Sequence, residues 1–248
     1  NYPLMRKTLV LLFTLFSCIL FAQDFSDLSF GTDSTFEIMT WNIEEFPKNG
    51  QTTVNQVKAI LEAVDVDFVC FQEIDDSTEL KLIAANISGY EVYIEEGFWS
   101  GLAVMYKSAT VTIEDIYTIY DAFAYWDIFP RAPLVIEMLV DGEKIVAINN
   151  HYKCCGDGNI DAGNLDDEET KRFEATNLLK QFIDGTFPDE KVILIGDLND
   201  ELTDEASKNV FQPFLNDTDN YRFADMDIAE GSSANWSYPL WPSHLDHI

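Results

Sequence analysis

A short apolar run followed by polar residues, KVILIGDLND at residues 191–200, most constrains the fold. Its four consecutive aliphatic residues leave no polar face, which is typical of a strand buried on both faces in the middle of a sandwich. Gly196 then lets the backbone turn, and Asp197 and Asn199 follow with one residue between them. In an extended chain this spacing sends both side chains to the same side. The pattern predicts either a site for a cation or polar substrate, or an Asp/Asn turn that merely ends the strand.

Apolar periodicity predicts strands and helices in alternation along the rest of the chain. Strands are predicted at residues 34–43, 67–71, 90–93, 101–106, 110–120, 133–140 and 144–149, and helices at residues 54–64, 78–87 and 168–183. The Asp141-Gly142 pair between the last two strands of the series is a hairpin signal. Strand, helix, strand, helix, then hairpins, then one more helix and strand indicate an α/β fold with mixed sheets.

The N-terminal 23 residues have the layout of a secretory signal peptide. Two basic residues precede an apolar run at residues 8–21, which is too short for a membrane span. A lipoprotein signal at Cys18 is the alternative, but the apolar run continues past this residue. We therefore expect residues 24–248 to form one secreted domain, extracellular or periplasmic, that is monomeric and has no stable membrane span.

The charge balance of the chain is strongly acidic. It has 44 Asp and Glu against 15 Lys and Arg, a formal net charge of -29. A surface of this sign repels polyphosphate backbones unless metal ions intervene. The alternative is that the charge keeps a secreted protein solvated in salty water, and composition does not separate the two.

Three cysteines remain after the predicted signal peptide. Cys70 lies in an apolar run and is expected to be a buried thiol. Cys154 and Cys155 are adjacent, in a compartment that permits disulfides. They could form a strained vicinal bridge or stay free, because connectivity does not follow from sequence.

Polar residues collect at the ends of the predicted strands. Asn42, Glu73 and His151 each follow one apolar run, and Asp197 with Asn199 follows another. Strand ends of layered α/β folds deliver side chains into one crevice. Carboxylates, amides and an imidazole gathered there suit a hard, oxygen-liganded cation and a proton-transfer group. Neither a GxxxxGK[ST] loop nor an HExxH motif occurs, which argues against those nucleotide and zinc sites.

Six motifs carry a resemblance to a known family. TWNIEEF, FQEI, RAPL, NNHYK, GDLND and SHLDHI occur in the order and approximate spacing of the endonuclease/exonuclease/phosphatase superfamily, whose members resemble DNase I. The resemblance covers residues 36–248. It implies a four-layer sandwich of two mixed β-sheets flanked by helices, and cleavage of phosphate esters that depends on Mg²⁺, with Mn²⁺ as the alternative.

The resemblance also implies a role for each matching residue. Asn42 and Glu73 would hold the metal ion, with Glu73 as the main ligand. His151 would act at the leaving group or the phosphate oxygens. Asp197 would orient the attacking water or the phosphate, with Asn199 beside it.

The C-terminal motif departs from the family pattern. Asp246 would orient a general-base histidine, which the family supplies from a Ser-Asp-His segment one strand later. The chain stops at Ile248, and His247 occupies the family's aromatic position, while His244 lies in front of Asp246. We therefore expect the domain to be incomplete at its C-terminus and the 248-residue chain to be inactive without that segment.

Two further residues in these motifs are candidates for substrate binding. Arg131, in RAPL, either clamps a phosphate or pairs with one of the many carboxylates. Asn149, in NNHYK, is the second candidate. The acidic loop at residues 157–169 has enough oxygens for a structural Ca²⁺ but fits no EF-hand spacing, so a solvated loop is the other interpretation.

These features together predict metal-assisted hydrolysis of a phosphate ester. A secreted endonuclease or phosphodiesterase acting on nucleic acid is the first interpretation. A phosphodiesterase or phosphatase for lipid headgroups or small molecules is the second, because the sequence shows no basic stripe for a phosphate backbone. A catalytically dead binding module on the same fold is the third.

Overall fold

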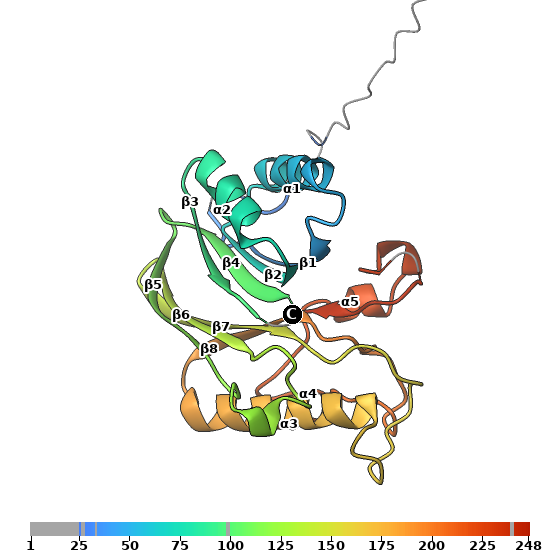
Figure 1. The fold of residues 1–248 in the computed structure, drawn as a ribbon. Coiled ribbons are helices and arrows are strands. Elements are labelled where there is room, and N and C mark those ends of the chain that lie inside the picture. The colour runs from blue at the N-terminus through green and yellow to red at the C-terminus, as the bar shows by residue number, and fades with distance from the viewer. Residues whose placement is uncertain (1–24, 26–27, 33, 98–99, 239–240) are drawn as a thin grey trace, which may run out of the picture.

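Two mixed β-sheets lie face to face at the centre of the molecule (Figure 1). The computed structural model describes residues 25, 28–32, 34–97, 100–238 and 241–248. The strands of the first sheet are β1 (Ile38–Phe46), β2 (Phe68–Ile74), β3 (Tyr90–Glu95) and β4 (Gly101–Lys107). Those of the second are β5 (Val111–Thr118), β6 (Leu134–Val140), β7 (Glu143–His151), β8 (Lys191–Asp197) and β9 (Asp246–His247). The strand orders are β1-β2-β4-β3 and β5-β6-β7-β8-β9. The pairs β1–β2 and β7–β8 are parallel, and the other neighbours are antiparallel.

Helices cover the outer face of each sheet (Figure 1). Helices α1 (Gln51–Val64) and α2 (Ser77–Asn86) lie on the first sheet, and α3 (Glu168–Thr186) lies on the second. Short helices α4 (Gln212–Leu215) and α5 (Met226–Ala229) and the 3₁₀ turns Phe123–Tyr125 and Ser233–Asn235 lie in connecting segments. The predicted four-layer α/β sandwich is confirmed.

Apolar side chains fill the space between the sheets. Phe68, Cys70 and Val104 of the first sheet belong to the same buried cluster as Ile136 and Met138 of the second. Because these positions alternate along each strand, the opposite faces are free to pack against the helices. Cys70 is fully buried, as predicted, and burial raises the pKa of its thiol far above the usual value. Its thiol is therefore an inert core group.

A second apolar layer joins each sheet to its helices. Leu61 of α1 and Leu80 of α2 pack in one cluster with Phe71 of β2. On the other side, Leu179 of α3 packs in one cluster with Ile148 of β7. The helical spacing of the apolar residues predicted these helices because only one face of each is buried.

The hairpin between β6 and β7 has the turn that its sequence predicts. Asp141 and Gly142 both have positive φ, 51° and 82°. A two-residue turn with positive φ at both positions matches the twist of antiparallel strands. The hairpin sets the register of β6 on β7, with Val140 opposite Glu143.

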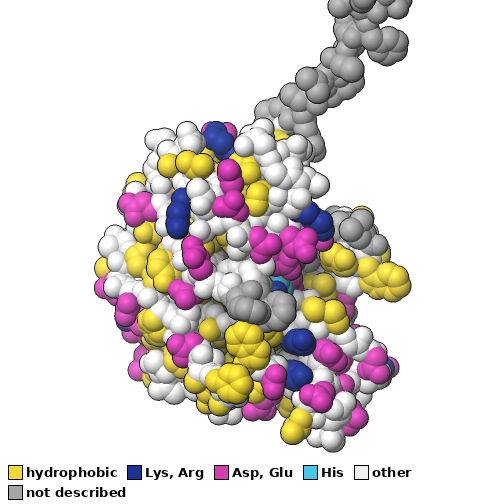
Figure 2. All heavy atoms as spheres, in the orientation of Figure 1, with side chains coloured by type: hydrophobic (Ala, Val, Ile, Leu, Met, Phe, Trp, Pro, Cys, Tyr) yellow, Lys and Arg dark blue, Asp and Glu magenta, His cyan; other side chains and the backbone are white. Residues whose placement is uncertain are grey.

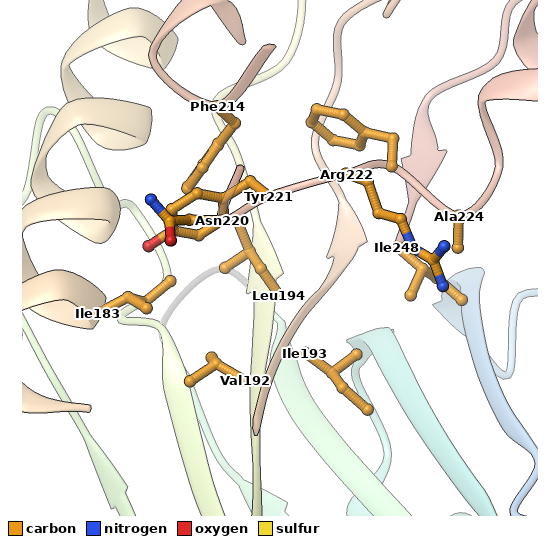
Figure 3. A pocket seen from close by; sticks show the side chains of 11 residues that line it. Ile183, Val192, Ile193, Leu194, Phe214, Asn220, Tyr221, Arg222, Ala224 and Ile248 are labelled. Carbon is orange, nitrogen blue, oxygen red and sulfur yellow. The ribbon is translucent and has the colours of Figure 1, made fainter. Parts of the chain in front are cut away.

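Strand β8 packs apolar side chains on both faces and lies between β7 and β9 rather than at the edge of its sheet, as predicted, although Val192, Ile193 and Leu194 are only partly buried. Val192 and Leu194 pack toward α3, and Ile193 packs toward the first sheet. This two-sided burial explains the unbroken aliphatic run. Along the outer side of β8, only Gly196 and Asp197 pair with β9. Within the described residues, a hollow of about 310 Å³ lies beside the rest of the strand, lined by its aliphatic residues, Phe214, residues 220–224 and Ile248 (Figure 3).

The predicted signal peptide, residues 1–23, lies outside the described residues. Within the described parts of the chain, none of the helices has the length and apolar character needed to cross a membrane. Secretion stays a prediction.

We expect the capping side chain of α2 to contribute measurably to stability. The carboxylate of Asp76 accepts hydrogen bonds from the backbone N–H groups of Thr78 (2.9 Å) and Glu79 (3.3 Å). Replacing Asp76 by Ala should lower the free energy of unfolding by about 1 kcal/mol, because both donors lose their partner. Urea denaturation measures the change. Asp76→Asn is the matched control, since Asn caps helices equally well. An equal loss in both variants would show that the charge of Asp76, not its capping bonds, matters.

Candidate active site

The carboxyl ends of β1, β2, β7 and β8 meet at one side of the sandwich, where a cavity of about 510 Å³ opens. Parallel pairing of β1 with β2 and of β7 with β8 brings these ends together. The cavity is lined by Asn42, Glu44, Glu73, His151, Cys154, Cys155, Asp197, Asn199, Ser237, Tyr238, Leu245 and Asp246. Six of the eight residues predicted for the site therefore share one cavity.

Irregular backbone near the strand ends turns Glu73 into the cavity. The pairing of β1 with β2 shifts register between Asn42 and Phe46. In β2, Glu73 has a φ of 63°, and the pairing with β4 shifts between Phe71 and Ile74. Bulges of this kind re-aim a side chain without ending the strand. Glu73 thus leaves the regular alternation of β2.

Asn42 joins two carboxylates across the two sheets. Its Nδ2 donates to Glu73 Oε1 (3.1 Å) and to Asp197 Oδ2 (2.8 Å). The second oxygen of Glu73 accepts from the backbone N–H of Glu45 (3.0 Å). One side-chain amide therefore holds an acid of the first sheet close to an acid of the second.

His151 lies beneath the same two carboxylates. Its Nε2 is 3.8 Å from Glu73 Oε1 and 3.8 Å from Asp197 Oδ2, and the side chain is 3% exposed. Burial, with a smaller contribution from the nearby charge of Arg131, lowers the pKa of His151 to about 3. The ring is neutral at neutral pH, so one nitrogen carries a proton and the other can accept one. Its buried Nδ1 has no hydrogen-bond partner in the described structure.

Asp197 also faces a third acid, Asp246, across the β8–β9 pair. The two are register partners, and among the described residues the buried Asp246 Oδ1 has no hydrogen-bond partner. Burial, followed by the charge of Asp246, raises the pKa of Asp197 to about 7, and burial raises that of Asp246. Neighbouring carboxylates of this kind favour a counter-ion or a shared proton.

These residues fit a hard divalent cation. Glu73, Asp197 and Asn42 offer carboxylate and amide oxygens, the ligand types of Mg²⁺ and Mn²⁺. The amide of Asn42 already links the two carboxylates through Nδ2, and its Oδ1 accepts from the backbone N–H of Glu44 (2.9 Å), a bond that it would give up to face the same space. The crowding of acids in a buried cavity is the observation that favours a cation here.

Asn199 completes the β8 end of the cavity. Its backbone N–H donates to Asp197 Oδ1 (3.1 Å), and its Nδ2 donates to the carbonyl of Tyr152 (3.2 Å). Its φ of 53° is the left-handed conformation that Asn tolerates better than most residues. Asn199 therefore fixes the orientation of Asp197 as well as lining the cavity.

The two predicted substrate-binding residues do not line this cavity. Asn149 is fully buried, and its amide accepts from Gln72 (2.7 Å) and donates to the carbonyls of Phe71 and Ala103 (both 3.1 Å). Its polar atoms are already used to join the two sheets, so the geometry does not support substrate binding by Asn149. Arg131 lines a neighbouring hollow of about 220 Å³.

Arg131 nevertheless acts on the cavity through its charge. Burial lowers the pKa of Arg131, while the charges of Glu73, Cys154 and Asp197 oppose that effect. These are residues of the cavity, so the guanidinium is near its edge. Of the two interpretations that the sequence leaves open, the structure shows Arg131 close to carboxylates, and a phosphate contact stays a prediction.

Cys154 and Cys155 line the cavity as free thiols, with their Sγ atoms 2.7 Å apart. Arg172 of α3 holds the loop in place by donating from Nη1 to the carbonyls of Lys153 and Cys155 (both 2.8 Å). The sequence left open whether these cysteines form a bridge, and here they do not.

Ser237 was missed by the sequence analysis. Its Oγ accepts hydrogen bonds from the backbone N–H groups of Leu245 (3.0 Å) and Asp246 (3.1 Å). These bonds fix the segment that carries Asp246 into the cavity. The contact joins two irregular segments, so no periodicity in the sequence could have indicated it.

Three carboxylates of the acidic loop at residues 157–169 also lie close together. Asp157, Asp167 and Glu169 each offer a carboxylate oxygen, and these atoms lie within 4.8 Å of one another. Gly158 donates its backbone N–H to Glu169 (2.5 Å), and Asp167 caps α3 through Thr170 (2.8 Å). Carboxylates in this loop thus have structural partners, and Ca²⁺ binding stays a prediction.

The chain belongs to the endonuclease/exonuclease/phosphatase family, whose model matches residues 39–248. Membership indicates a hydrolase of phosphodiesters, and enzymes of this family generally use divalent metal ions. The resemblance inferred from the six motifs is confirmed. No curated protein matches the sequence.

Solved structures show the same fold at low sequence identity. The human nocturnin catalytic domain with bound sulfate anion has a TM-score of 0.61 and 17% identity, covering 85% of this chain and 80% of that one. D. rerio TDP2 complexed with a single-strand DNA product has a TM-score of 0.57 and 15% identity, covering 81% and 73%. A humanized D. rerio TDP2 with 14 mutations has a TM-score of 0.51 and 16% identity and is matched over 66% of each chain.

Proposed function

We propose that the protein is a secreted, metal-dependent phosphodiesterase and that nucleic acid is its principal substrate. The observation that carries the proposal is the convergence of Asn42, Glu73, His151, Asp197, Asn199 and Asp246 in one cavity at the strand ends. The bound groups of two structures with this fold, a sulfate anion and a single-strand DNA product, support a phosphate-ester substrate.

The cavity residues divide the catalytic work between them. Glu73 and Asn42 would hold the cation, Mg²⁺ in the first instance and Mn²⁺ as the alternative, which when bound neutralises charge on the phosphoryl oxygens. Asp197, held by Asn42 and by the N–H of Asn199, would orient the attacking water. His151 is neutral and can donate a proton from one ring nitrogen to a phosphoryl or leaving-group oxygen.

Asp246 stands opposite Asp197, and its buried Oδ1 is available to a further group. A carboxylate in this position can orient a histidine that acts as general base. The presence of such a histidine stays a prediction, and activity is to be measured on the full-length protein.

A small-molecule or lipid-headgroup phosphodiester is the second candidate substrate. The net charge of -29 favours it, because a long polyanion approaching this surface is repelled along its whole length. Acidic side chains are also spread over the face of the molecule shown in Figure 2. For a compact phosphodiester, the negative charge of the protein has to be screened only at the cavity, where the cation would lie.

An assay with four substrates tests the proposal. The full-length protein is incubated with plasmid DNA, RNA, sphingomyelin vesicles or bis(p-nitrophenyl) phosphate, each with Mg²⁺, with Mn²⁺ or with a chelator. We expect hydrolysis of the nucleic acids that requires the metal ion. Cleavage of sphingomyelin or the small diester alone would replace the nucleic-acid substrate by the second class. Binding without cleavage of any substrate would indicate a catalytically dead module.

A further inference from the structure

A second group of metal-binding side chains lies outside the catalytic cavity. Asp225 Oδ2 is 2.9 Å from His244 Nε2 and 2.7 Å from His247 Nδ1. The three side chains are buried, at 8%, 5% and 0% exposure. None of them lines the catalytic cavity. Two imidazoles and a carboxylate therefore converge within the protein, brought together from two separate segments of the chain.

Asp225 and His247 each make a further hydrogen bond through their other polar side-chain atom. The other oxygen of Asp225 accepts from the backbone N–H of Ile248 (3.0 Å). The second nitrogen of His247, Nε2, is 2.8 Å from the carbonyl of Asp200 and is oriented to donate to it. Metal-binding histidines commonly donate their second N–H to a carbonyl or carboxylate, which fixes the ring and its tautomer. His247 and Asp225 thus have the outer contacts typical of metal ligands.

The surroundings keep this group dry and charged. The ring of His247 packs edge-on against Phe211 and Phe223, with centroids 5.5 and 6.1 Å away. Burial alone would raise the pKa of Asp225, but the contacts with His244 and His247 outweigh it and hold the pKa well below the usual value. Asp225 is therefore ionised, which is the form that binds a metal. His244 Nδ1 is buried and has no hydrogen-bond partner within the described residues.

We propose that Asp225, His244 and His247 form a second metal site, separate from the catalytic one and selective for Zn²⁺-like ions. Two nitrogens and one carboxylate oxygen are ligands that zinc accepts, whereas Mg²⁺ and Ca²⁺ require oxygen ligands. Three protein ligands leave the fourth tetrahedral position to a water. The site thus differs in ligand chemistry from the oxygen-rich catalytic cavity.

The observed distances are close to those of such a site. Ligands at about 2.0–2.1 Å from a tetrahedral zinc ion lie about 3.3 Å apart. The O–N separations of 2.7 and 2.9 Å need to open by only a few tenths of an ångström. The three candidate ligand atoms all lie within 4.8 Å of one another.

The site would act on the segment that carries Asp246. His244 and His247 lie two residues before and one residue after Asp246, and both are tied to Asp225. An ion bound there would fix residues 244–248 against residue 225 more firmly than two hydrogen bonds. Because it binds only the folded form, the ion would also stabilise the protein in proportion to its free concentration.

Cobalt is a suitable probe of the site, because four-coordinate Co²⁺ absorbs visible light far more strongly than six-coordinate Co²⁺. The full-length protein is stripped with a chelator and titrated with CoCl₂, and ZnCl₂ is then added as a competitor. We expect an intense visible band that saturates at one ion per chain and is abolished by Zn²⁺ but not by excess Mg²⁺. The thermal unfolding midpoint should rise on addition of Zn²⁺.

Variants of His151, His244 and Asp225 locate the signal. Among the 3 histidines of residues 1–248, His151 lies in the catalytic cavity, so His151→Gln is the matched control for His244→Gln. We expect the band to persist in the first variant and to disappear in the second. Asp225→Asn should also abolish it. Unfolding curves without metal establish that each variant is folded.

Two results would overturn the proposal. If the intact protein gives no tetrahedral Co²⁺ band and no shift with Zn²⁺, protons alone join the three side chains. If the band is lost in His151→Gln and kept in His244→Gln, the ion binds in the catalytic cavity. Neither result depends on phosphodiesterase activity, so the proposal stands or falls separately from the proposed function.

Discussion

Hydrolysis by the full-length protein is expected to fall by on the order of 10²-fold or more when Glu73 is replaced by Gln. The substitution keeps the size of the side chain and an oxygen for the amide of Asn42, but removes the charge that would hold the cation. The backbone N–H of Glu45 also loses a charged acceptor, which is a smaller effect on stability. Initial rates against Mg²⁺ concentration measure the change. The rate at saturating Mg²⁺ and the apparent affinity for the ion should both decrease.

The matched control removes one carboxylate charge far from the cavity. Glu62 lies on α1, is 47% exposed and pairs with Lys58 of the same helix. Glu62→Gln changes the net charge by the same amount and should leave the rate within about twofold, because an exposed pair of this kind contributes little. If Glu73→Gln keeps the Mg²⁺ dependence and the rate of the unchanged protein, Glu73 is not the metal ligand.

Most of the fold was predictable because burial imposes a period on the sequence. The helices at residues 54–64 and 168–183 have one apolar face each, and the structure places them at Gln51–Val64 and Glu168–Thr186. The additional residues, 51–53 and 184–186, are at the helix ends, where exposed or half-buried positions extend beyond the apolar periodicity. The partial burial of Val192, Ile193 and Leu194 was not predictable, because the aliphatic run does not show that β9 pairs with only the last residues of β8.

The candidate site was predictable to the extent that it lies at strand ends. Asn149 shows the limit of that rule. It and His151 occupy alternate positions of β7 and so share one face of the strand. Asn149 still lies over the first sheet and bonds to Phe71 and Ala103, whereas His151, two residues on, reaches the cavity. The sequence of β7 alone does not show where the facing sheet ends.

Contacts between irregular segments were beyond the reach of sequence patterns. Asp225 precedes a short helix and has no periodic neighbours, yet it binds both His244 and His247. The bulge that turns Glu73 into the cavity likewise has no signal in the residue types of β2. In both cases the tertiary structure, and not local preference, determines where the side chain points.

Gly196→Ala is expected to have the largest effect on stability. Gly196 pairs with Asn150 in the parallel contact of β7 with β8, and its φ is 144°. A Cβ added there would lie 2.0 Å from the carbonyl oxygen of Asn150, which is backbone and cannot rotate away. Overpacking costs about 1–3 kcal/mol and a strained φ a similar amount, so the free energy of unfolding should fall by at least about 2 kcal/mol. Urea denaturation should show a lower midpoint at unchanged m-value.

The same substitution should reduce hydrolysis, because the next pair along these strands is His151 with Asp197. Separating β7 from β8 by about 1 Å would move the two side chains apart, and a displacement of that size can cost about 10²-fold in rate. Gly142→Ala is the control, since Gly142 also has a positive φ, 82°, but an added Cβ would have no neighbour within 4 Å. That variant should show the cost of φ strain alone and keep its activity. Equal losses of stability in the two variants would contradict the role assigned to the contact with Asn150.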